Sequence, residues 1–304
     1  MNEKNVMYLK DNLKYMGFGE TLNDSLEAAV KEAKPDFQLT LNQKMNEGDL
    51  SATLHFRQSP SSGMYFFNSY EARLSRENGY QQSQQFYLNN GRGVTLKEAY
   101  NLLAGRSVLK ELTSIEGVNY HAWLKIDFNQ RKSENQHQVR QFHAEKYGFD
   151  LLAELSKLNL SPLTQEKEQQ LLQSLQKGNR QAASFIKDQK EELLFIEANP
   201  QFKTINISNG RGQYLSRSEK EHYTYQETSV VANEVPPSSA DNTDPEEKQA
   251  LAIPRGVEVP KEHVESGDKK NIDPFSETNE SRTKAIKDLL PAGKRKNKKS
   301  LKIN

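Results

Sequence analysis

No cysteine occurs among the 304 residues of the chain. This absence excludes disulfide bonds, thiolate metal ligands and a cysteine nucleophile, and it is consistent with a reducing compartment. No apolar run approaches the roughly 18 residues of a membrane-spanning helix. The N-terminal stretch MNEKNVMYLKDNLKYMGFGE mixes charged and apolar residues and has no apolar segment typical of a signal peptide. We therefore expect a cytoplasmic protein with no membrane partner.

The motifs that identify many enzymes and metal sites are also absent: the glycine-rich phosphate loop, GxGxxG, GxSxG and HExxH do not occur. His137 and His143 are the only histidines close in sequence, and on a strand they would lie roughly 20 Å apart, at about 3.3 Å per residue. That spacing is too wide for ligands of one metal ion. Glu197 is a candidate general base, but no nucleophile or second carboxylate lies near it in sequence. We expect no catalytic residue, no cofactor and no metal.

Apolar residues are scarce for the length of the chain, at 34%, whereas 27% of residues are charged. Seven of the 11 prolines follow Arg217. A segment of this composition buries too little apolar surface to fold alone. We predict an α+β N-terminal domain over 1–145, a small helix-hairpin α+β unit over 146–215, and a disordered tail over 216–304.

Charge is segregated within the predicted tail. Residues 219–280 contain 15 acidic and 6 basic residues, a net charge of −9, whereas residues 281–304 contain 9 basic residues and 1 acidic residue, a net charge of +8. The basic end is a candidate contact for the phosphates of DNA or RNA, and the alternative is a solubilising tail. The side chains that would make this contact are Lys294, Arg295, Lys296, Lys298 and Lys299.

The remainder alternates helical and strand patterns. Apolar residues at helical spacing predict a first helix, which stops at Gly17 and Gly19. A second helix is expected to begin with Thr21 or Asn23 as its cap, and a third with Thr95 as its cap. Runs with period-2 alternation are separated by short turns, so the strands are antiparallel and the fold class is α+β, with helices packed on the strands. The order helix, glycine, strand, turn, strand occurs twice, which suggests a degenerate repeat.

Two aromatic-rich strands admit two interpretations each. Trp123, the only tryptophan, could mark a binding surface or lie in the core. The run MYFFNSYEARL places four aromatic residues within six positions, which is typical either of a base-stacking platform or of a buried strand. The charges around MYFFNSYEARL are of both signs, which favours a buried strand over a base-stacking platform. For Trp123 we also favour a place in the core.

The tetrapeptide NGRG occurs at Asn90–Gly93 and again at Asn209–Gly212, each time after a short apolar run. Asn-Gly after such a run is typical of a hairpin turn, because glycine adopts positive φ without strain. The turn interpretation leaves Arg92 and Arg211 as exposed side chains, so the alternative is a contact with a phosphate backbone.

Several stretches of the chain, in order, resemble one family. They include LKYMGFGETLNDSLEAAV, GVTLKEAYNLLAGRSVLKELT, YGFDLLAEL and, as the most specific, KGNRQAASF with FIEANPQFKTINI. Together with MYFFNSYEARL and YHAWLKIDF they make the chain similar, from Leu13 to Ile207, to uncharacterised proteins encoded on conjugative and mobilisable elements of Bacteroides-type bacteria. Many of those relatives continue with a Tyr-Asp pair where this chain has SNGRGQYL, which puts a shared role for Arg211 in doubt.

The resemblance implies a context alongside DNA-transfer or DNA-processing proteins, and it implies no catalytic residue. We therefore expect a non-enzymatic accessory protein of a mobile element that tethers or binds nucleic acid, an element-encoded partner protein, or both. An alternative is a protein-binding adaptor or inhibitor without nucleic-acid affinity, which would use the acidic segment and a short helix at 281–290. A third is an enzyme whose site the sequence does not reveal.

Overall fold

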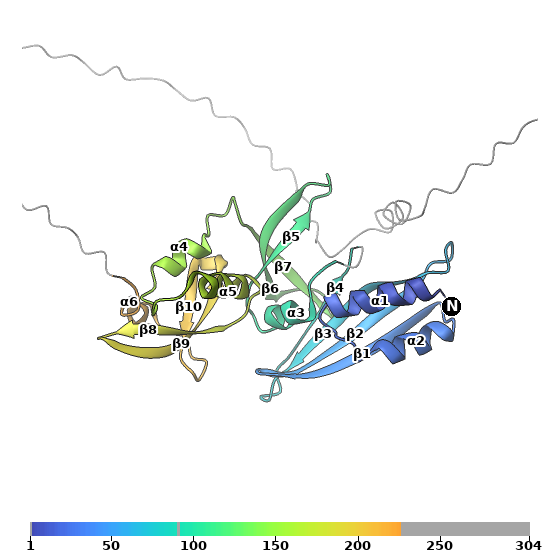
Figure 1. Ribbon diagram of the computed structural model, residues 1–304, viewed down its shortest axis with the longest axis horizontal. Helices are drawn as coiled ribbons and strands as arrows, with labels where there is room; N and C mark the ends of the chain where they lie inside the picture. Colours follow the sequence, from blue (N-terminus) through green and yellow to red (C-terminus); the bar gives the residue numbers. More distant parts are fainter. Residues whose placement is uncertain (1, 90–91, 226–304) are drawn as a thin grey trace, which may run out of the picture. The chain divides into compact units, whose positions relative to one another are not determined.

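The computed structural model describes residues 2–89 and 92–225, which fall within one compact unit (Figure 1). The predicted α+β class is confirmed for these residues, because three antiparallel sheets carry helices packed against them. Residues 226–304, which hold most of the predicted tail and the predicted helix at 281–290, lie outside the described residues. Within the described ranges, no helix is long and apolar enough to cross a membrane.

The first sheet has four strands in sequence order, each antiparallel to its neighbour. These strands are β1 (Asp36–Met45), β2 (Gly48–Gln58), β3 (Tyr65–Ser75) and β4 (Gln81–Tyr87). Their register aligns one buried side chain from each strand, in the order Leu39, Leu54, Tyr70 and Phe86. Cross-strand pairs of this kind stabilise a sheet. The aromatic run in β3 is therefore a core strand, which is the interpretation that the sequence favoured over a base-stacking platform.

Three helices cover one face of this sheet: α1 (Glu3–Tyr15), α2 (Asn23–Lys31) and α3 (Leu96–Leu103) (Figure 1). The predicted cap of α3 is confirmed, because the Thr95 hydroxyl accepts from the Glu98 amide and the Glu98 carboxylate accepts from the Thr95 amide at 2.8 Å. The predicted cap of α2 is wrong. Leu22 occupies the cap position without a side-chain hydrogen bond, and its burial in the core fixes the start of the helix instead.

The second sheet consists of β5 (Val108–Thr113), β6 (Asn119–Ser133) and β7 (Gln136–His143), with β6 in the middle. Alternate side chains of β6 point to opposite faces. Leu124 and Ile126 join the core under the first sheet, whereas Trp123 joins a second core. Trp123 is 3% exposed and its ring centroid lies 5.5 Å from that of Phe149, so the core interpretation of Trp123 is confirmed.

The second core lies among the remaining elements, and its centre is formed by the fully buried Leu175, Phe185 and Ile196. These elements are α4 (Leu151–Ser156), α5 (Gln165–Gln176), β8 (Gln181–Lys187), β9 (Lys190–Asn199), the short 3₁₀ helix η1 (Pro200–Phe202), β10 (Thr204–Ser208) and α6 (Arg217–Glu221). The third sheet has the order β10-β9-β8.

The folded chain continues to Tyr225, past the predicted limit at residue 215. Tyr223 explains the difference, because its ring packs edge-on against Phe185 and its hydroxyl donates to Glu192 at 2.7 Å. The predicted domain boundary near residue 145 falls between β7 and α4, and β6 contributes to both cores. That boundary stays a prediction.

A cationic cavity as the candidate functional site

The residues that the sequence singled out for nucleic-acid contact are not gathered in one place by the described structure. The five basic residues from Lys294 to Lys299 lie outside the described residues. Arg92 and Arg211 are both exposed, each at a turn. Neither guanidinium group has a hydrogen bond or ion pair to another described residue. Both arginines are therefore free to contact a ligand, but each stands alone on its loop.

The second NGRG is a turn, as predicted. The Asn209 side-chain oxygen accepts from the backbone amides of Arg211 at 3.0 Å and Gln213 at 3.1 Å, and Gly212 has φ +82°. At the first copy, Asn90 and Gly91 lie outside the described residues, and the flanking Asn89 and Arg92 exchange two backbone hydrogen bonds of 2.8 and 2.9 Å.

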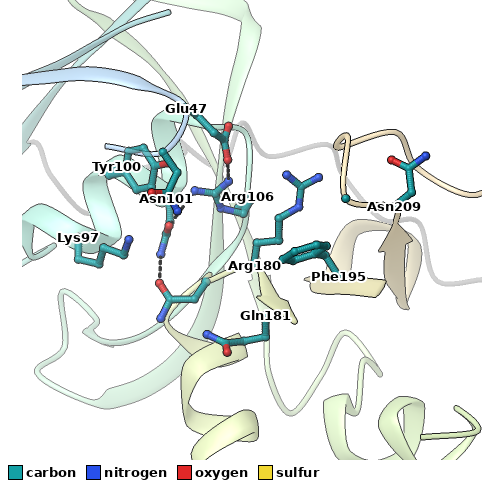
Figure 2. A pocket seen from close by; sticks show the side chains of 12 residues that line it. Glu47, Lys97, Tyr100, Asn101, Arg106, Arg180, Gln181, Phe195 and Asn209 are labelled. Carbon is teal, nitrogen blue, oxygen red and sulfur yellow. Dashed lines mark hydrogen bonds and ion pairs between the residues drawn. The ribbon is translucent and has the colours of Figure 1, made fainter. Parts of the chain in front are cut away.

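A different set of basic residues meets at a cavity of about 390 Å³ (Figure 2). Its cationic side chains are Lys97 of α3, Arg106 just before β5, and Arg180 just before β8. Glu47, in the turn between β1 and β2, is the only carboxylate among its lining residues. The remaining polar lining consists of amide side chains from Asn46, Asn101, Asn179, Gln181 and Asn209.

Arg106 is a buried cation, and each nitrogen of its guanidinium group donates a hydrogen bond. Its Nε donates to the Gly178 carbonyl at 3.0 Å, its Nη2 donates to Asn101 Oδ1 at 2.9 Å, and its Nη1 donates to Glu47. Burial alone would lower the pKa of Arg106, but the charge of Glu47 and its hydrogen bond outweigh burial and raise it. Arg106 therefore stays charged and builds the cavity wall rather than offering free donors.

Asn101 joins the two halves of the cavity. Its amide nitrogen donates to the Lys177 carbonyl at 2.7 Å and to Asn179 Oδ1 at 2.9 Å. The bond from Arg106 to Gly178 crosses the same junction. Asn101 is 1% exposed, so these bonds form away from water, where an unpaired amide would be costly. The wall of the cavity is therefore rigidly held between α3 and the end of α5.

Arg180 differs from Arg106, because part of its guanidinium group has no partner. Its Nη2 donates to Ser208 Oγ at 3.0 Å and to the Gly212 carbonyl at 3.4 Å. Its Nε is buried and forms no hydrogen bond. Its Cζ lies 5.9 Å from the centre of the Phe195 ring, and in Figure 2 the group projects between Arg106 and Asn209. A buried N–H without an acceptor is uncommon in folded proteins and calls for an explanation.

Lys97 provides the third positive charge. Its Nζ lies 4.7 Å from the centre of the Tyr100 ring, on which Arg106 also packs, with its Cζ at 5.1 Å. Burial and the positive charge of Arg106 lower the pKa of Lys97. The positive charges of Lys97 and Arg106 therefore repel each other, and an anion between them would relieve this repulsion.

Glu197, which the sequence suggested as a general base, lies elsewhere. Neither Glu197 nor Asp127 lines the cavity, and no histidine does. Glu197 accepts hydrogen bonds from the Tyr214 hydroxyl at 2.7 Å and from the Asn206 amide at 3.1 Å. Burial raises the pKa of Tyr214, and the hydrogen bond to Glu197 raises it further. Asp127 accepts from Arg140 Nε at 2.8 Å. In the part of the chain that the structure describes, no three side chains of His, Cys, Asp or Glu come together as metal ligands.

Both arginines of the cavity stand near a glycine that ends a helix. Arg106 comes directly after Gly105, which follows α3, and Arg180 comes two residues after Gly178, which follows α5. Both glycines have positive φ, at +87° and +77°. The degenerate repeat stays a prediction, because the two arginines differ by one residue in their distance from these glycines. Lys97 and Glu47 carried no local signal, because only the packing of the first core brings them there.

Comparisons with known proteins found no matching family model, no matching curated protein and no matching solved structure.

Proposed function

We propose that this chain is a cytoplasmic, non-enzymatic accessory protein of a conjugative or mobile element that binds nucleic acid through phosphate groups. One observation carries the proposal: the cavity sets Lys97, Arg106 and Arg180 against the single carboxylate of Glu47, a net charge of +2. Arginine and lysine are the side chains that recognise phosphate. The context of a mobile element comes from the sequence resemblance.

The proposal assigns two contacts to the protein. The cavity is the built contact on the folded part, and the basic end at 281–304, with its net charge of +8, is an electrostatic contact. Because the two contacts are on one chain, binding at one of them raises the effective concentration of the bound partner at the other. The mechanism is therefore tethering, in which the folded part and the basic end hold nucleic acid, or nucleic acid and an element-encoded protein, together.

The proposal is tested by measuring nucleic-acid binding at two salt concentrations, with the full chain and with a chain that ends at Leu290. The truncation removes six basic side chains. If all six contact the phosphates of double-stranded DNA, the affinity of the full chain falls by roughly 10³-fold between about 50 and 200 mM salt. We expect the truncated chain to bind more weakly and with a shallower salt dependence. Absence of DNA and RNA binding by both chains at low salt would contradict the proposal.

The second candidate is a protein-binding adaptor or inhibitor, and the acidic segment favours it. Residues 219–280 have a net charge of −9, which repels phosphate and suits a basic protein surface. If neither chain binds nucleic acid, capture of a partner protein by the full chain becomes the next measurement. Loss of capture when residues 226–304 are removed, but not when the chain ends at Leu290, would then assign the contact to residues 226–290.

A further inference from the structure

The net charge of the cavity suits a phosphomonoester better than a phosphodiester. A phosphodiester inside a strand has one negative charge, whereas a phosphomonoester at a strand end or on a free nucleotide has nearly two at neutral pH. The cavity has three positive charges and one negative charge. A ligand with two negative charges therefore neutralises it, whereas a ligand with one leaves it positive.

The donors without partners point to the same ligand. Arg180 Nη1 has no hydrogen-bond partner among the described residues, and Lys97 Nζ contacts only the Tyr100 ring there. Arg180 Nη1 offers charged N–H groups that hydrogen-bond to phosphate oxygens, and Lys97 adds a point charge. These two side chains come from α3 and from the loop before β8, so an anion held by both would bridge the cavity.

The rest of the lining suits the remainder of a nucleotide. The volume of about 390 Å³ is near the lower end of the range for small-molecule sites, roughly 300–1,000 Å³. Phe195 presents an aromatic ring to the cavity, and aromatic rings stack on bases of any sequence. Asn46, Gln181 and Asn209 present amides, which hydrogen-bond to base edges and sugar hydroxyls.

We infer that the cavity binds the phosphomonoester of a nucleotide, with Lys97 and Arg180 holding the phosphate group. The inference rests on the proposed function in that it takes the cavity as a phosphate site, and it goes further by naming the kind of phosphate. Two sources share this chemistry: the 5′-phosphorylated end of a nucleic-acid strand and a free nucleoside monophosphate.

The test compares the affinity of the full chain for one short single-stranded DNA with a 5′-phosphate and with a 5′-hydroxyl, labelled at the 3′ end. Adenosine monophosphate and inorganic phosphate serve as competitors. We expect the 5′-phosphate to improve affinity by about tenfold or more, since charge-assisted hydrogen bonds are strong. Lys97→Gln is expected to abolish this preference. Lys97 is exposed, so the substitution leaves the core intact.

Two further variants separate binding from folding and from general charge. Arg180→Lys keeps the charge and removes the guanidinium Nη1 donor, so we expect it to reduce the preference while the protein remains folded. Arg211→Gln removes one charge from the loop beside the cavity without touching a lining guanidinium, and we expect it to keep the preference. Equal loss in Arg211→Gln and Lys97→Gln would show a general charge effect and overturn the inference.

The outcomes distinguish this inference from the proposed function. If adenosine monophosphate binds and the protein has equal affinities for the two DNA strands, the inference is supported and a free nucleotide is identified as the source. Binding of adenosine monophosphate without any strand binding also supports it, and contradicts the proposed function. Equal strand affinities, with no competition by millimolar adenosine monophosphate or phosphate, overturn the inference and leave nucleic-acid binding in place.

Discussion

A Gly178→Ala variant is expected to lose about 3 kcal/mol of unfolding free energy. Gly178 has φ +77°, and a side chain in this left-handed region costs about 1–2 kcal/mol. The added Cβ would also lie 2.7 Å from the Ser107 carbonyl oxygen and 2.9 Å from Val108 Cγ2. Overpacking of this kind costs about 1–3 kcal/mol more. Equilibrium unfolding in urea measures the difference.

Gly105→Ala is the matched control. Gly105 also follows a helix and has φ +87°, but a Cβ there would meet nothing within 4 Å. It is therefore expected to show only the backbone cost, about 1–2 kcal/mol. Equal losses in the two variants would mean that the close approach of Gly178 to Ser107 and Val108 is not a constraint on the junction beside the cavity.

Arg106→Met is expected to lower the unfolding free energy by about 3 kcal/mol. Breaking a buried ion pair by removing one partner costs roughly 3–5 kcal/mol, because the other charge stays behind. The side chain of Arg106 is 5% exposed and that of Glu47 is 27% exposed. Arg76 still lies 3.5 Å from Glu47, so the lower end of the range applies. The Gly178 carbonyl and Asn101 also lose a donor each.

Arg57→Met serves as the control for this second prediction. Arg57 pairs with Asp36 at 2.8 Å, but the two side chains are 71% and 59% exposed, and such surface pairs contribute less than about 1 kcal/mol. Adding Glu47→Gln to Arg106→Met is expected to recover part of the loss, because it removes the uncompensated charge. If Arg106→Met unfolds at the same urea concentration as Arg57→Met, the buried pair is not a structural requirement of the cavity.

The sequence predicted those elements whose pattern is local. Val6, Leu9 and Leu13 repeat at helical spacing and are buried in α1. The strands of the first sheet alternate with period 2, and Thr95 and Glu98 form the predicted capping box. The start of α2 was missed, since Leu22 is placed there by burial in the core rather than by a capping side chain. Tyr223 was missed for a similar reason, because its partners Phe185 and Glu192 are distant in sequence.

The candidate site was less predictable than the fold. The sequence pointed to Arg92 and Arg211 through the repeated NGRG tetrapeptide, and to the basic end through its run of basic residues. The cavity instead assembles Glu47, Lys97, Arg106 and Arg180 from separate segments. Their spacing in sequence carries no periodic signal, so only tertiary packing brings them together. One residue of the motif that the sequence singled out does reach the cavity: Asn209 of the second NGRG turn lies in the cavity wall.

The central claim is that the cavity holds a phosphate group of nucleic acid, and hydrogen–deuterium exchange of the full chain locates the ligand most directly. Exchange is compared with and without a saturating 5′-phosphorylated single-stranded DNA. We predict slower exchange in segments 178–182 and 209–213, which line or adjoin the cavity, and no change in the exposed turn at 115–118. Slower exchange that avoids both cavity segments, while other parts of residues 2–225 are protected, would contradict the claim.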